Sequence, residues 1–200
     1  MGGNGEDRNM KLIEEKLACA LLQPDIINDN RGWFQVAFNI DDIHNLGLDF
    51  SGVCQLNHSW TEEKGVVRGP NYQKAPYNQV KVVRVTRGAV YSVGIDINPE
   101  SSTFGKAVGF LLSEKNKFLM YIPNTYAHGF TVLEDNTELE YLTDNKYNYE
   151  SAKSIWFDDE EIIDIDTMKK LDWSFNGAVI LNNIKSEKNL NAPRLRDADL

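Results

Sequence analysis

Residues 29–34 of this chain, Asp-Asn-Arg-Gly-Trp-Phe, combine an arginine with a turn glycine and two aromatic side chains. The guanidinium of Arg31 can form paired hydrogen bonds with a phosphate, and Phe34 can stack on a nucleobase. The same residues could instead make a surface ion pair and two core aromatics, because exposed arginines are common. Taken alone, the segment does not decide between these interpretations.

Two further stretches carry polar side chains that a packed strand does not need. Gln55, Asn57 and Ser59 would lie on one face of a strand, since successive side chains point to opposite faces. Residues 68–73, Arg-Gly-Pro-Asn-Tyr-Gln, follow after a predicted turn. A polar stripe of this kind either faces water, as polar strand faces usually do, or lines a cavity.

One histidine and two tyrosines are candidates for proton transfer. His128 lies between small residues at the start of an apolar strand, in the run Tyr-Ala-His-Gly-Phe. Tyr141 lies in a predicted strand, with Tyr147 shortly after it, and a tyrosine hydroxyl directed into a pocket can donate a proton. In isolation, a structural histidine and a core or rim tyrosine are the commoner interpretations.

The sequence contains no motif for metal binding, nucleophilic catalysis or dinucleotide binding. His44, His58 and His128 are widely separated and have no metal-ligand spacing, so no metal site is expected. The sequence has no Gly-x-Ser-x-Gly elbow, no Cys-His signature and no Gly-x-Gly-x-x-Gly dinucleotide loop. Cys19 and Cys54 each have apolar neighbours, which favours two buried free thiols over a disulfide.

The composition is typical of one globular domain, which we expect to be cytoplasmic. The 200 residues are 42% hydrophobic and 26% charged, and no apolar run is long enough to span a membrane. A formal net charge of -9 disfavours nucleic acid as a partner, because that binding depends on Lys and Arg. The polar start lacks the features of a secretory signal, so we expect a flexible terminus at residues 1–10 and a single domain at residues 11–200.

Short segments rich in Val, Ile, Phe and Tyr predict an all-β sandwich or barrel with a few short peripheral helices. The predicted strands are residues 33–39, 52–57, 79–86, 89–97, 107–112, 117–122, 129–133, 137–142 and 178–181. Short helices are predicted at residues 40–46, which Asn39 and Gly47 would bound, and at residues 167–171.

Taken in order, these stretches resemble the dTDP-4-dehydrorhamnose 3,5-epimerase family over residues 29–193. The shared pattern is an Asp-x-Arg-Gly-x-Phe segment, a Gln-x-Asn-x-Ser strand, an Arg-Gly-x-His-x-Gln turn, a lysine-bearing strand, a Pro-x-x-x-Ala-His-Gly-Phe turn and a late tyrosine. The resemblance implies a homodimeric, cupin-like jelly-roll β-sandwich that needs no cofactor and no metal. It also implies an isomerase that inverts the carbons beside the C4 ketone of a nucleotide-linked keto-deoxysugar. In that reaction a base forms an enolate and an acid returns a proton to the opposite face.

The resemblance also assigns roles to individual residues. Lys81 would lie near the ketone oxygen, Tyr141 would be the proton donor, and His128 would belong to the pocket. The residues that would bind the substrate are Arg31 and Arg68 at the diphosphate or sugar, Phe34 at the base, Gln55, Asn57 and Gln73 in the pocket wall, Tyr147 at the rim and Trp156 in the closing segment.

Two positions depart from the family pattern. Asn71 occupies the place of the catalytic histidine, and Asn189 occupies the place of the aspartate that orients it. An amide has no basic lone pair near neutral pH and cannot abstract a carbon-bound proton. Three functions stay open: an isomerase that uses His128 or Tyr141 as its base, a non-catalytic protein that binds a nucleotide sugar, and a different reaction on a related keto-sugar.

Overall fold

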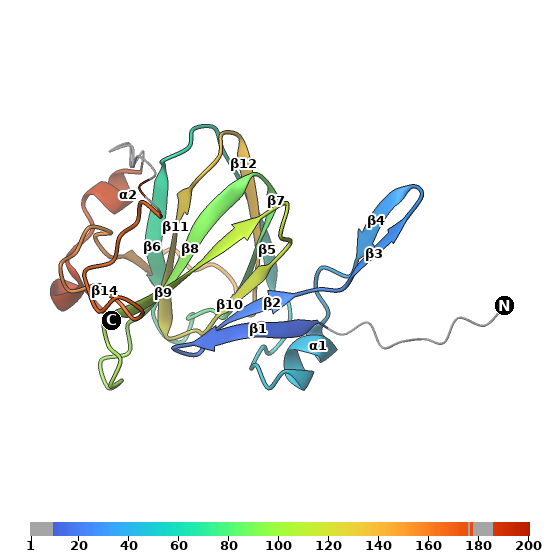
Figure 1. The fold of residues 1–200 in the computed structure, drawn as a ribbon. Coiled ribbons are helices and arrows are strands. Elements are labelled where there is room, and N and C mark those ends of the chain that lie inside the picture. Colours follow the sequence, from blue (N-terminus) through green and yellow to red (C-terminus); the bar gives the residue numbers. More distant parts are fainter. Residues whose placement is uncertain (1–9, 176, 178–185) are drawn as a thin grey trace.

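The computed structural model describes residues 10–175, 177 and 186–200. Within these residues the chain forms two six-stranded sheets packed as a sandwich, a separate hairpin, two short α-helices and one 3-10 turn (Figure 1). The predicted all-β sandwich with short peripheral helices is confirmed.

The first sheet is antiparallel and has the strand order β1-β2-β10-β7-β12-β5. Its strands are β1 (Lys11–Lys16), β2 (Cys19–Gln23), β5 (Gln55–Thr61), β7 (Lys81–Arg87), β10 (Leu119–Ile122) and β12 (Thr137–Thr143). Its outer face is covered near helix α1 (Ile40–Asn45), where Ile43 and Phe50 are fully buried with Val82. The predicted start of this helix is confirmed, because the Asn39 side chain accepts a hydrogen bond from the Asp41 backbone N–H.

The second sheet has the strand order β13-β6-β11-β8-β9-β14. Its strands are β6 (Val67–Gln73), β8 (Ala89–Asp96), β9 (Lys106–Ser113), β11 (Tyr126–Val132), β13 (Ala152–Ser154) and β14 (Ile163–Asp164). The chain after β13 covers its outer face, and the buried side chains of Trp173 and of Leu195 in the 3-10 turn η1 (Leu195–Asp197) belong to that layer. Every residue of β8 is buried because both of its faces are covered.

The space between the sheets has an apolar end and a polar end. The apolar end is a cluster that includes Val83, Met120 and Leu139. The polar end lies beside β5, the edge strand of the first sheet, where Gln55, Asn57 and Ser59 are half-buried and the residues between them are exposed. The sandwich therefore encloses a polar region at one edge, and the alternating stripe predicted for residues 55–59 lies there.

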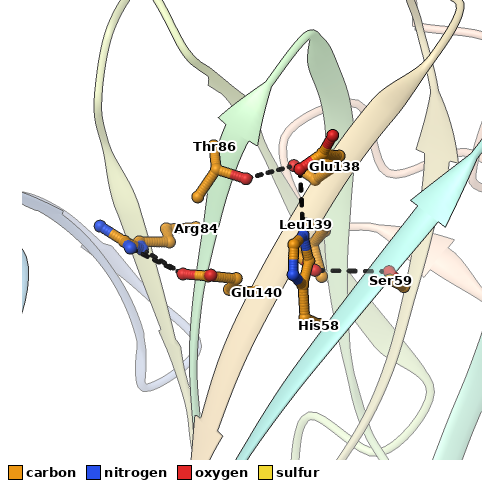
Figure 2. Close-up of polar contacts among 7 residues, drawn as sticks. All are labelled: His58, Ser59, Arg84, Thr86, Glu138, Leu139 and Glu140. Atoms are coloured by element: carbon orange, nitrogen blue, oxygen red, sulfur yellow. Dashed lines mark hydrogen bonds and ion pairs between the residues drawn. The ribbon is translucent and has the colours of Figure 1, made fainter.

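An ion pair on one side and a hydrogen bond on the other hold β12 in register between β7 and β5 (Figure 2). The Arg84 guanidinium donates two hydrogen bonds to Glu140 Oε2, at 2.9 and 2.6 Å. On the other side, His58 Nε2 lies 3.2 Å from Glu138 Oε2. A slip of one residue would turn every side chain of β12 to the other face, so these pairs hold Leu139 and Tyr141 toward the interior.

The strands β3 (Ile26–Asp29) and β4 (Gly32–Gln35) pair only with each other among the described residues. Their hairpin stands away from the sandwich, on the side opposite α2 (Glu187–Leu190) (Figure 1). The predicted strand at residues 33–39 is therefore too long, because β4 ends at Gln35. The Nζ of Lys117 lies 3.8 Å from the ring centroid of Trp33, which is a cation–π contact between the hairpin and the sandwich.

Three other predictions need correction or remain outside the described residues. The helix predicted at residues 167–171 is wrong: the segment is a turn in which Asp164 Oδ1 accepts from the Thr167 N–H at 2.7 Å. Cys19 is buried as predicted, but Cys54 is exposed. The strand predicted at residues 178–181 lies outside the described residues.

Candidate functional site

A cavity of about 510 Å³ lies at the polar end of the sandwich, between β5 and β12 of one sheet and β6 of the other. A second cavity of about 230 Å³ shares Asn71, Tyr141, Ser186 and Asn189 with it. Arg68 lines the larger cavity and Lys81 lines the smaller one. A volume of this order suits a small organic ligand.

An irregularity in β6 turns Arg68 and Asn71 into the same cavity. Residues three apart on a regular strand point to opposite faces, yet both of these line the larger cavity. The register between β6 and β11 shifts at this place. Gly69 has a φ of +86°, and a Cβ there would lie 2.6 Å from the backbone oxygen of His128, so only glycine fits.

The structure brings Asn71 and Asn189 into contact. Asn71 Oδ1 accepts hydrogen bonds from Ser154 Oγ at 2.7 Å and from Asn189 Nδ2 at 3.3 Å. Asn189 reaches the site from α2 and is 8% exposed. Two neutral amides and a hydroxyl thus occupy this wall of the cavity. Ser154 is a contact that the sequence analysis missed, because nothing in the short run around it suggests a site.

Tyr141 and Lys81 approach the cavity from the first sheet. Tyr141 lines both cavities, and burial raises the pKa of its hydroxyl, helped by nearby Tyr147 and opposed by Arg68. The phenol is therefore neutral at pH 7 and can donate a proton. Lys81 is 7% exposed, and its Nζ donates to the backbone oxygen of Asn71 at 3.2 Å.

His128 is buried next to residues that line the cavities but does not line them itself. It pairs with Asn71 across β11 and β6. Its ring is buried, and Nε2 lies 3.0 Å from Ser92 Oγ. Burial, with a smaller contribution from the Lys81 charge, holds the pKa of His128 well below 6.5, so the ring is neutral at pH 7.

His128 should make the protein less stable in mild acid. Its pKa in the folded state is lower than in the unfolded state, so the unfolded chain binds the additional proton as the pH falls below 6.5. The free energy of unfolding should then fall by up to about 1.4 kcal/mol per pH unit from this group. Urea unfolding of the wild type and of His128→Gln between about pH 7.5 and 5 measures the effect. The variant should have the shallower pH dependence, and parallel curves would contradict the assignment.

The predicted pocket residues Gln55, Asn57 and Gln73 contact the protein itself. Gln73 lines the smaller cavity, but both of its amide ends bond to backbone groups. Gln55 Nε2 donates to Asn57 Oδ1 at 2.5 Å, and Gln55 Oε1 accepts from the Tyr147 N–H at 3.0 Å. Tyr147 lines the smaller cavity, as expected of a rim residue.

Three other predicted residues lie away from the two cavities of this chain. Arg31 and Phe34 are on the β3–β4 hairpin, where the Arg31 side chain is 85% exposed and forms an ion pair with Asp29. Trp156 packs against Phe157, with 5.0 Å between ring centroids, in the layer outside the second sheet.

No cluster of three or more His, Cys, Asp or Glu side chains in residues 10–175, 177 and 186–200 could hold a metal ion. None of the helices described there is long and apolar enough to cross a membrane.

Comparison with known proteins places this chain in a family. The family model described as dTDP-4-dehydrorhamnose 3,5-epimerase matches residues 16–197. The chain belongs to this epimerase family. Its homologues are dTDP-4-dehydrorhamnose 3,5-epimerases, isomerases of deoxysugar biosynthesis that need no cofactor.

Individual epimerases match along most of the chain. The Escherichia coli enzyme is 43% identical over 175 residues, which is 86% of this chain and 90% of that protein. The Elizabethkingia anophelis epimerase superposes with a TM-score of 0.82 at 35% identity, covering 96% of this chain and 100% of the other. The Legionella pneumophila epimerase, crystallised with dTDP-4-keto-L-rhamnose, has a TM-score of 0.83 at 33% identity, with 96% and 95% coverage. The predicted cupin-like fold is confirmed by these neighbours.

Proposed function

We propose that the chain binds a dTDP-linked 4-keto-6-deoxyhexose and isomerises it at a carbon beside the ketone. Arg68 would hold the diphosphate in the larger cavity, and the sugar would occupy the smaller cavity beside Lys81 and Tyr141. Lys81 supplies the positive charge that stabilises an enolate oxygen, and Tyr141 supplies a transferable proton. The ligand seen with the Legionella pneumophila epimerase supports the substrate class.

One observation carries this proposal. Asn71 belongs to β6 of the second sheet and Tyr141 to β12 of the first, and both line the same two cavities. A sugar between them would have one residue on each face. Inversion of a carbon requires groups on opposite faces, because the proton leaves one face and another returns on the other.

The altered dyad predicts that this chemistry is slow. The face beside Asn71 has an amide pair instead of the histidine and aspartate expected from the family pattern, and an amide removes no carbon-bound proton. No histidine is among the described residues lining the two cavities, which disfavours His128 as a substitute base. Tyr141 would then transfer protons on its own face, and water would have to do so on the face of Asn71. Because burial raises the pKa of Tyr141, little phenolate is present at pH 7 to act as a base.

A nucleotide-sugar-binding protein without catalysis is the second candidate. The hydrogen bonds among Asn71, Asn189 and Ser154 favour it, because they satisfy the polar atoms of this wall without a charge. The phosphate-binding side of the pocket, at Arg68, is unaffected by these amides.

A homodimer is part of the proposal. The hairpin that carries Arg31 and Phe34 stands away from the sandwich (Figure 1), and neither residue lines the two cavities. Both residues belong to the motif that the family resemblance assigns to the ligand. A second copy that received this hairpin at its own pocket would bring them to the diphosphate and the base.

Proton NMR of dTDP-4-keto-6-deoxyglucose in deuterium oxide tests the proposal. Slow entry of deuterium at C3 or C5 that depends on the protein would support an isomerase. Binding without exchange would support the non-catalytic candidate. Absence of both would contradict the proposed ligand.

The Arg68→Leu variant should bind dTDP about 10- to 100-fold more weakly than the wild type. A charged hydrogen-bonding contact to a phosphate is lost, and this is among the stronger polar interactions. In the ligand-free chain Arg68 Nε donates to Thr61 Oγ1 at 3.0 Å, which holds the guanidinium at the cavity. Isothermal titration calorimetry measures the change. The matched control is Arg87→Leu, at an exposed arginine at the end of β7, which should leave dTDP affinity unchanged.

A further inference from the structure

The segment between β12 and β13 carries Tyr147 to the smaller cavity, where Tyr141 also lies. Residues 145–148 of this segment belong to no strand. Lys146 and Tyr147 are exposed, Asn145 and Asn148 are half-buried, and no sheet pairs the backbone of these four residues. Backbone groups without a sheet partner bond to water or to side chains, and three glutamine side chains bond to them here.

Gln73 makes three hydrogen bonds to backbone groups, two of them to this segment. Its Oε1 accepts from the Asn148 N–H at 2.7 Å, and its Nε2 donates to the backbone oxygens of Tyr77 at 2.5 Å and Lys146 at 3.1 Å. A primary amide has two N–H donors, and both are committed to the protein. At 7% exposure, Gln73 is nearly enclosed. It cannot donate to a ligand without giving up one of these two bonds.

Two other glutamines complete the arrangement. Gln55 Oε1 accepts from the Tyr147 N–H at 3.0 Å, and Gln79 Nε2 donates to the backbone oxygen of Asn145 at 2.7 Å. Four consecutive residues, 145–148, thus each have a backbone group bonded to a glutamine side chain. A glutamine suits this task because one side chain both donates and accepts.

We propose that Gln73, assisted by Gln55 and Gln79, is a positioning residue that fixes Tyr147 against the sugar-bearing end of the pocket and thereby determines which keto-sugar fits. This inference rests on the proposed function, because it takes the smaller cavity as the sugar site. The electrostatic influence of Tyr147 on the pKa of Tyr141 agrees with the closeness of the two hydroxyl-bearing rings.

The Gln73→Glu variant tests the inference because it keeps the shape of the side chain but cannot donate to two backbone oxygens. Its affinity for dTDP-glucose, used as the sugar-bearing probe, should fall about tenfold, while its affinity for dTDP changes by less than about twofold. A merely structural defect would weaken both ligands alike. Gln23→Glu, at a half-buried glutamine of β2, is the matched control and should change neither affinity.

A double-mutant cycle with Tyr147→Ala gives the second measurement. If Gln73 acts through Tyr147, the double variant should bind dTDP-glucose no more weakly than Tyr147→Ala alone. The inference would be overturned if the double variant lost affinity by the product of the two single-variant losses. It would also be overturned if dTDP and dTDP-glucose lost affinity equally. If Gln73→Glu fails to fold, Gln55→Met replaces it in the same test, because this variant removes the hydrogen bond to the Tyr147 N–H.

Amide hydrogen exchange of the ligand-free protein separates failure of this inference from failure of the proposed function. The Asn148 amide should exchange at least about tenfold faster in Gln73→Glu than in the wild type. Unchanged exchange would overturn the anchoring role directly. A wild-type protein that binds neither dTDP nor dTDP-glucose would overturn the proposed function, and the positioning role with it, whatever the exchange result.

Discussion

Replacing Asn71 by histidine and Asn189 by aspartate together should accelerate deuterium exchange at C3 and C5 of dTDP-4-keto-6-deoxyglucose by about 10²- to 10⁴-fold. The side chains of residues 71 and 189 already touch, with 3.3 Å between Asn71 Oδ1 and Asn189 Nδ2. An imidazole and a carboxylate at these positions could form the hydrogen bond that orients a base and stabilises its protonated form. Proton NMR in deuterium oxide measures the exchange rate directly.

The single variants are the controls for this gain. Asn71→His alone should recover only part of the rate, because the imidazole lacks a charged partner. Asn189→Asp alone should recover none, and it should destabilise the fold by about 1 to 3 kcal/mol, since it places a carboxylate beside Asn71 Oδ1 with little exposure to water. A double variant that binds the sugar nucleotide but exchanges no faster than the wild type would contradict the proposed site.

Tyr141→Phe in the Asn71→His, Asn189→Asp background should separate exchange from inversion. The histidine on β6 would still remove and return a proton on its own face, so deuterium would continue to enter the sugar. Return of a proton on the opposite face should slow by about 10²- to 10⁴-fold, because phenylalanine has no proton to donate. Rates of deuterium entry and of appearance of the inverted sugar, measured in one NMR experiment, give both quantities.

The position of Tyr141 makes this outcome specific. The Tyr141 side chain comes from the first sheet, whereas residue 71 belongs to the second sheet. Contacts of Glu138 with His58 and of Glu140 with Arg84 hold strand β12, which carries Tyr141, in register (Figure 2). Phenylalanine keeps the ring, so packing should change little. Equal loss of deuterium entry and inversion would mean that Tyr141 acts on both steps and that residue 71 is not the base.

The sequence predicts the strands β8 and β12, at residues 89–97 and 137–142, where apolar residues are frequent or alternate with polar ones. It does not predict the short strands β1, β2 and β3, although β2 is mostly apolar and buried. The family pattern implies a turn at residues 68–73, but Gly69 and Pro70 lie within β6, where these residue types are uncommon. Their presence inside a strand reflects the register shift that directs Arg68 and Asn71 into one cavity.

The sequence predicts which residues belong to the candidate site better than it predicts the contacts that they make. Asn71, Lys81, Tyr141 and Asn189 converge as expected of one pocket. Periodicity placed Gln55 in the polar stripe, but it could not show that this side chain is bonded to the backbone of Tyr147, more than 90 positions away in the chain. Contacts of this kind depend on loop conformation, which residue types alone do not determine. The positions of Arg31 and Phe34 relative to a pocket likewise depend on how two copies of the chain assemble, which residue types do not determine.

The division of the sandwich interior into an apolar and a polar end bears on how such a protein can evolve. The cluster around Val83, Met120 and Leu139 provides the packing, whereas the larger cavity is lined by positions on β5, β6 and β12 at the other end. Substitutions at those positions leave the packing of this cluster in place, so their cost to folding stability comes from the local polar contacts. A lineage can exchange a histidine and an aspartate for two asparagines, or reverse that exchange, while it keeps the same scaffold.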